Sequence, residues 1–112
     1  QYTVARINSI LNKVGVEGGT IKIWDKDEHD IMLAILKLLN AYEICYQDRS
    51  LNALCLASYD LASAFSTFYN NHHILNESDK EKQASYISLL KLVKKELAQA
   101  LNVLGIELPE RM

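Results

Sequence analysis

The sequence predicts an all-α fold, an antiparallel bundle of four or five helices in one domain. Three observations lead to this prediction. Apolar residues recur at spacings of three and four in four segments of the chain. These segments end at residues typical of helix termini, such as Gly15 and Gly105. With 112 residues, of which 49% are hydrophobic and 23% charged, the chain has an ordinary globular composition and the size to bury a core of its own.

The central helix is predicted over residues 50–70. Neither glycine nor proline interrupts this segment, and one helical face carries an apolar stripe. Ser50 is a candidate N-cap, and the run Asn70-Asn71-His72-His73 is expected to end the helix. The stripe consists of Leu54, Ala57, Leu61, Phe65 and Phe68.

Two further helices are predicted at the ends of the chain. The first covers residues 1–14, buries Val4, Ile7, Leu11 and Val14, and stops at Gly15. The last follows Ser78-Asp79-Lys80-Glu81, which matches a capping box with Ser78 at the N-cap and Glu81 at N3. It stops at Gly105, and its inward residues are expected to be Ile87, Leu90, Val93, Leu97, Leu101 and Leu104.

The remaining helix begins after an acidic run and is expected to reach about Leu39, deeply buried. Asp25 or Asp27 is its candidate cap. Residues 41–48 either continue it or form a short separate helix. A metal site with His29 matches neither an EF-hand nor a zinc spacing, and adjacent histidines such as His72-His73 chelate one ion poorly. No metal site is therefore predicted.

The Gly-rich stretch 15–24 lacks the context of a phosphate-binding loop and is predicted to be a surface loop. Ile21, Ile23 and Trp24 are expected to pack against the bundle. Cys45 and Cys55 have no CxxC partner and are expected to be buried, reduced thiols. With a net charge of −2, any RNA binding requires a local site rather than a general electrostatic attraction.

Three short strings carry a more specific signal: QYTVARI at the start, YDLASAFSTFYN in the middle and LNVLGIELPERM at the end. Together they resemble the C-terminal, DALR-type anticodon-binding domain of arginyl-tRNA synthetase, over the whole chain. Because the chain starts at Gln1 and ends on the family's terminal string, the resemblance implies that residues 1–112 are one domain, a C-terminal fragment of a larger synthetase.

The resemblance also implies a function. The anticodon loop of arginine tRNA would be bound by Tyr2, Arg6, Tyr69 and Met112, with the catalytic domain of the same chain as the second partner. The parent would be a cytoplasmic class I ligase that uses ATP and magnesium to join arginine to its tRNA. The fragment itself would have no catalytic residue, cofactor, metal or membrane contact.

Two alternatives remain open at this point. One is the anticodon domain of a related synthetase, the cysteinyl or glycyl enzyme, against which the PERM ending argues. The other is a non-enzymatic helical adaptor, which would present a contiguous apolar patch to a protein partner.

Overall fold

The computed structural model describes residues 2–13, 18–48, 51–72 and 74–105. They form helices α1 (Tyr2–Lys13), α2 (Lys26–Asp48), α3 (Asn52–Asn71) and α4 (Lys80–Val103), with a short 3-10 turn, η1 (Ile74–Asn76). The four helices account for more than two-thirds of the chain, and the described residues contain no strand. The predicted all-α bundle is confirmed.

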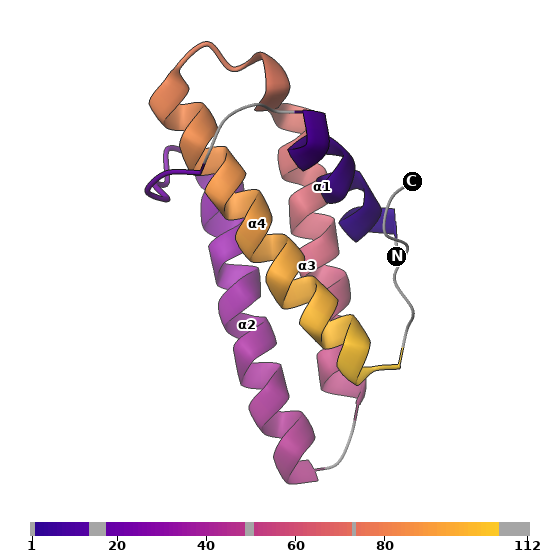
Figure 1. Ribbon diagram of the computed structural model, residues 1–112. Helices are drawn as coiled ribbons and strands as arrows, with labels where there is room; N and C mark the ends of the chain where they lie inside the picture. The colour runs from indigo at the N-terminus through magenta and orange to yellow at the C-terminus, as the bar shows by residue number, and fades with distance from the viewer. Residues whose placement is uncertain (1, 14–17, 49–50, 73, 106–112) are drawn as a thin grey trace.

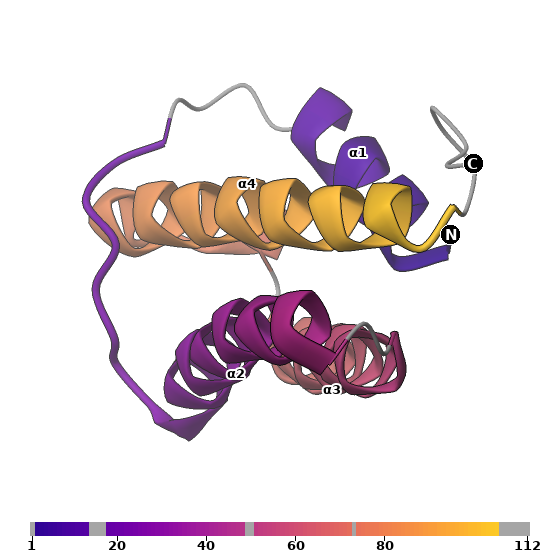
Figure 2. The ribbon, with the colours of Figure 1, turned by 90° about the horizontal axis from the view of Figure 1, so that it is seen from below.

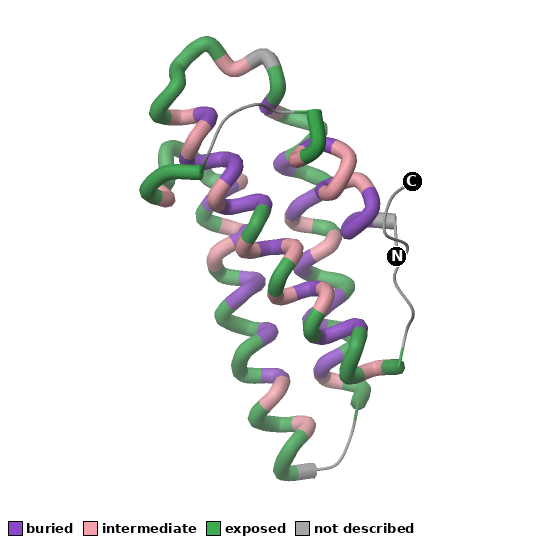
Figure 3. Tube along the Cα trace, in the orientation of Figure 1, coloured by how far each residue is buried: buried purple, intermediate pink, exposed green. Residues whose placement is uncertain are grey.

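The helices form two layers. Helices α2 and α3 make an antiparallel hairpin with the most extensive contact in the molecule. Helix α4 crosses one face of this hairpin, and α1 lies beside α4 and also contacts α3 (Figures 1 and 2). The buried residues line the faces that the helices turn toward one another (Figure 3).

The central helix is confirmed as the element around which the core forms. All five residues of its predicted stripe are buried, from Leu54 to Phe68. Leu61, Phe65, Leu90, Leu97 and Leu101 belong to one core cluster, as the 3.6-residue period predicts. Helix α3 contacts α2 within its own layer and α4 and α1 in the other layer.

The expectation that the second helix is deeply buried is wrong. Ile31, Ala34 and Leu38 are in the core, but Leu36 is 60% exposed, and Leu33 and Leu39 are also exposed. The reason is the two-layer arrangement, which covers only one face of α2. The helix also continues without a break to Asp48, so residues 41–48 are not a separate element.

The helix starts differ from the prediction by one residue in two places. Asp79, not Ser78, is the N-cap of α4, where its side chain accepts hydrogen bonds from the backbone N–H groups of Glu81 and Lys82. At α3 the N-cap position is Leu51, which makes no side-chain cap hydrogen bond, and Ser50 lies outside the described residues. The predicted stop at Gly105 is confirmed, with φ of 79° after the end of α4.

The start of α2 is a capping box. Asp25 Oδ1 accepts from the N–H of Asp27 at 3.0 Å, which confirms Asp25 as the cap. Glu28 reaches back from the third helical position, and its Oε2 accepts from the N–H groups of Trp24 and Asp25 at 2.8 and 2.7 Å. Glu28 is fully buried, so this carboxylate belongs to the interior of the domain.

Residues 18–24 are irregular, as predicted, and their backbone is hydrogen-bonded to α4. Gly19 N–H donates to the Ala84 carbonyl, and Ser88 Oγ donates to the Gly19 carbonyl. Ser85 Oγ accepts from Lys22 N–H at 2.8 Å. The segment is therefore fixed by polar contacts along α4 more than by the apolar contacts the sequence suggested.

The three apolar residues of this segment have different surroundings. Ile21 packs against the core, and the ring of Trp24 meets Tyr86 edge-on with centroids 6.2 Å apart, although Trp24 is 40% exposed. Ile23 is about half exposed, so the expectation that it packs on the bundle is wrong.

Both cysteines are free thiols. Cys45 is half-buried and Cys55 is exposed, so the expectation that both are buried is wrong for Cys55 and only partly met for Cys45.

Among the described residues, no helix combines the length and the apolar character that crossing a membrane requires.

Candidate nucleic-acid interface

The four residues predicted to bind RNA lie on two helices and the C-terminus. Arg6 is on α1 and Tyr69 is in the last turns of α3. Tyr2 starts α1, but its side chain is outside the described part of the structure, as is Met112. The structure therefore describes how two of the four side chains are placed.

Arg6 and Tyr69 are in direct contact. The guanidinium carbon of Arg6 is 4.6 Å from the centroid of the Tyr69 ring, within the range of a cation–π interaction. Arg6 is half-buried and Tyr69 is 36% exposed, so the pair lies at the surface rather than in the core. An arginine and an aromatic ring that the sequence separates by 63 positions share one surface here.

The packing of α1 and α3 explains this contact. Val4 and Ile7 are buried on either side of Arg6 and fix that helix on the bundle. On α3, Phe65 is fully buried one turn before Tyr69, and the two ring centroids are 6.0 Å apart. The Tyr69 ring is therefore in contact with both the buried ring of Phe65 and the guanidinium group of Arg6.

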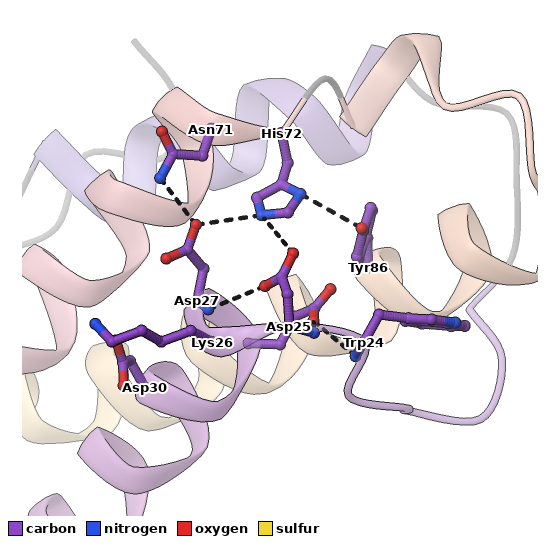
Figure 4. A network of polar contacts seen from close by, with 9 residues as sticks. Trp24, Asp25, Lys26, Asp27, Asp30, Asn71, His72 and Tyr86 are labelled. Atoms are coloured by element: carbon purple, nitrogen blue, oxygen red, sulfur yellow. Dashed lines mark hydrogen bonds and ion pairs between the residues drawn. The ribbon is translucent and has the colours of Figure 1, made fainter.

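A second polar cluster joins the start of α2 to the end of α3 (Figure 4). His72 Nε2 is 3.4 Å from Asp25 Oδ2 and 3.3 Å from Asp27 Oδ2. On its other side, His72 Nδ1 is 3.4 Å from the hydroxyl of Tyr86 on α4. The sequence does not predict this cluster, because its residues belong to three separate parts of the chain and match no short motif.

The Tyr86 hydroxyl at the centre of this region stays protonated over the ordinary pH range. Its residue is 1% exposed, and burial raises the pKa of the Tyr86 hydroxyl above the usual value. The negative charge of the neighbouring Glu28 raises this pKa further. The hydroxyl is therefore available as both a donor and an acceptor between Glu28 and His72.

The fold and the surface pair define a class of protein: a small helical domain that presents an aromatic ring and an arginine together at one site. Comparison with known families identifies the class. The DALR anticodon binding domain matches residues 1–112, and the chain belongs to this family.

Curated relatives carry the name arginine–tRNA ligase. The chain is 35% identical to the ligase of Agathobacter rectalis over 119 residues and 35% identical to that of Alkaliphilus oremlandii over 116, covering 99% of this chain in both. It is 33% identical to the ligase of Alteromonas mediterranea over 117 residues and 100% of this chain. The chain spans about a fifth of the length of these relatives. The resemblance found in the three sequence strings is thus confirmed.

Proposed function

We propose that this domain binds the anticodon loop of arginine tRNA, with Tyr69 as a stacking surface for a base and Arg6 as a contact to a phosphate or base edge. The observation that carries the proposal is the surface contact between Arg6 and Tyr69. Sequence-specific RNA recognition commonly uses single-stranded loop bases that stack on aromatic rings or guanidinium planes. A ring held by Phe65 and Arg6 is preorganised for such a stack.

The base to be recognised follows from the genetic code. Every arginine codon has G at its second position, so every arginine tRNA has C in the middle of its anticodon. A pocket for cytosine needs an acceptor for the exocyclic amine and donors for the ring nitrogen and carbonyl. We assign donors to Arg6, a second ring face to Tyr2, and the amine contact to the terminal carboxylate of Met112, whose side chain packs on the base.

The whole protein, in this proposal, is a cytoplasmic class I arginine–tRNA ligase. Its reaction joins arginine to tRNA with ATP and magnesium, and this domain supplies binding rather than chemistry. The names of the relatives and the one-fifth share of their length support a parent of this kind. Catalytic and ATP-binding residues would then lie in the remainder of the chain, which we propose as the domain's second partner.

The alternatives have less support. The relatives reported above are named as arginine ligases, and none of those three is a cysteinyl or glycyl enzyme. An adaptor function would rest on exposed apolar residues of the outer α2–α3 face, such as Leu36 and Leu56. A face of that kind also suits contact with the rest of a synthetase, so it does not favour an adaptor.

The test is a binding titration of the full-length protein with an arginine tRNA. Tyr69→Ala should weaken binding by about 1–3 kcal/mol, the usual contribution of one base–aromatic stack. Tyr69→Phe should lose less because the ring remains. Arg6→Ala should weaken binding and reduce its salt dependence if Arg6 contacts a phosphate. Deletion of Met112 should reduce affinity without unfolding the domain.

The matched control is Tyr59→Ala, because Tyr59 is a more exposed tyrosine on the same helix, at 70%, and is outside the proposed site. A tRNA with U in place of the middle C presents reversed donors and acceptors and should bind more weakly. Equal binding of the C and U forms, or equal losses for Tyr59→Ala and Tyr69→Ala, would show that the assigned site is wrong.

A further inference from the structure

Asp25, Asp27 and His72 bring three metal-ligating atoms to one point at the open end of the α2–α3 hairpin (Figure 4). Asp25 is the cap that precedes α2, Asp27 lies in its first turn, and His72 follows the last residue of α3. The three ligand atoms lie within 4.8 Å of one another, and His72 Nε2 is 3.3–3.4 Å from each carboxylate oxygen.

Each of the three side chains also makes a further contact that orients it. Asp25 Oδ1 accepts from the Asp27 N–H, which leaves Oδ2 turned toward His72. Asn71 Nδ2 donates to Asp27 Oδ2 at 2.9 Å. The His72 ring stacks on Phe68 with centroids 4.5 Å apart. Metal-binding side chains are oriented in this way by hydrogen bonds from groups outside the ligand set.

Two buried groups, Glu28 and Tyr86, lie beside the cluster. Glu28 Oε1 is shielded from solvent and accepts no hydrogen bond, while Oε2 accepts from the Asp25 backbone beside the cluster. The hydroxyl of Tyr86 contacts His72 Nδ1 at 3.4 Å. An unpaired buried carboxylate oxygen is costly and calls for a donor.

A cation on His72 Nε2 would also fix the tautomer of the imidazole ring. A metal binds neutral imidazole, so the ring proton must be on Nδ1. Nδ1–H then donates to the Tyr86 oxygen, which lies 3.4 Å away. This contact would orient the imidazole behind the metal.

We propose that Asp25, Asp27 and His72 form a zinc site that ties the start of α2 to the end of α3. Mixed imidazole and carboxylate ligands suit Zn²⁺, whereas Mg²⁺ prefers oxygen atoms in an octahedron. In a tetrahedral site with bonds of about 2.0–2.1 Å, neighbouring ligand atoms are about 3.3–3.4 Å apart, which agrees with the spacing around His72 Nε2. The 45% exposed side chain of Asp25 leaves the fourth position open to water. This inference does not depend on RNA binding.

The experiment is calorimetric titration of the metal-stripped full chain with zinc chloride. Wild type should bind one equivalent more than Asp27→Asn or His72→Gln, and the melting temperature should rise with zinc only when this equivalent binds. Tyr86→Phe should keep the site but weaken it about tenfold or more. His29→Gln is the matched control, since exposed His29 lies beside Asp30 on the same helix and outside the cluster.

A second measurement needs no variant. In wild type, zinc should shift the Nε2 nuclear resonance of His72 and leave that of His29 unchanged. The same stoichiometry in wild type and both ligand variants, or no zinc-dependent change at His72, would overturn the proposal. The cluster would then be only a set of polar contacts between His72 and the two carboxylates.

Discussion

Replacement of Glu28 tests whether its buried carboxylate stabilises or destabilises the folded domain. Oε2 accepts two backbone hydrogen bonds at the start of α2, from Trp24 and Asp25, and this closes the capping box. Oε1 of the same group is buried without a partner. The two oxygens therefore act in opposite directions on the free energy of unfolding.

The magnitude follows from these contacts. Hydrogen bonds to a charged acceptor contribute about 1.5–3 kcal/mol each, so losing both would cost roughly 3–6 kcal/mol. Removing an unpaired buried oxygen returns about 1–3 kcal/mol of desolvation energy. We expect Glu28→Ala to lower the free energy of unfolding by about 2–3 kcal/mol. Glu28→Gln keeps a carbonyl oxygen for both N–H groups and places an amide next to Tyr86, so it should cost about 1 kcal/mol or less.

The assay is urea unfolding of the metal-free protein at neutral pH, followed by far-ultraviolet circular dichroism. The control is Glu43→Ala, which removes an exposed glutamate from the same helix and should change stability little. If the Gln and Ala variants of Glu28 lose the same stability, charge rather than capping is what matters and the reasoning is refuted.

Two other predictions concern stability. A Cβ at Gly18 would lie 2.4 Å from Ser88 Oγ, which donates to the Gly19 carbonyl. Gly18→Ala should therefore lower the free energy of unfolding by about 1 kcal/mol. In a Ser88→Ala background this loss should largely disappear, and an unchanged loss would contradict the steric explanation. Burial raises the pKa of both Tyr86 and Tyr42. Tyrosines in the unfolded chain ionise at about pH 10, whereas these two ionise at higher pH in the folded domain. The free energy of unfolding should therefore be unaffected below about pH 10 and fall above it, by up to about 1.4 kcal/mol per pH unit for each tyrosine. Unfolding curves from pH 9 to 11 check this, and Tyr86→Phe should reduce the slope.

The helices and the core were predictable because they depend on local periodicity. A stripe such as Leu54 to Phe68 has only one stable arrangement, with its apolar side against other helices, and the structure places it there. Which apolar side chains of a helix stay exposed to solvent was not predictable in the same way. Leu33 and Leu36 are as apolar as Leu38, yet only Leu38 is buried, since the face that α4 covers is decided by the packing of the layers.

The candidate RNA site was predictable only through the family strings. Nothing in the spacing of Arg6 and Tyr69 indicates that they touch, and a lone tyrosine or arginine is usually solvated. Their contact at 4.6 Å agrees with the grouping that the resemblance implied, although the assigned RNA contacts remain predictions. The polar contacts between residues 18–24 and α4 were missed because serine positions such as Ser85 and Ser88 give no periodic signal.

The cluster around His72 shows why two correct local interpretations can still miss a site. Asp25 does cap α2, as the acidic run predicted, but its second oxygen faces a histidine beyond the end of another helix. A spacing rule cannot find that pairing, because 45 residues separate Asp27 from His72 and the antiparallel hairpin brings them together. The contacts of His72 also affect the candidate RNA surface. His72 follows the last turn of α3 and stacks on Phe68, which directly precedes Tyr69. Contacts that hold His72 therefore also restrain the end of the helix that presents Tyr69.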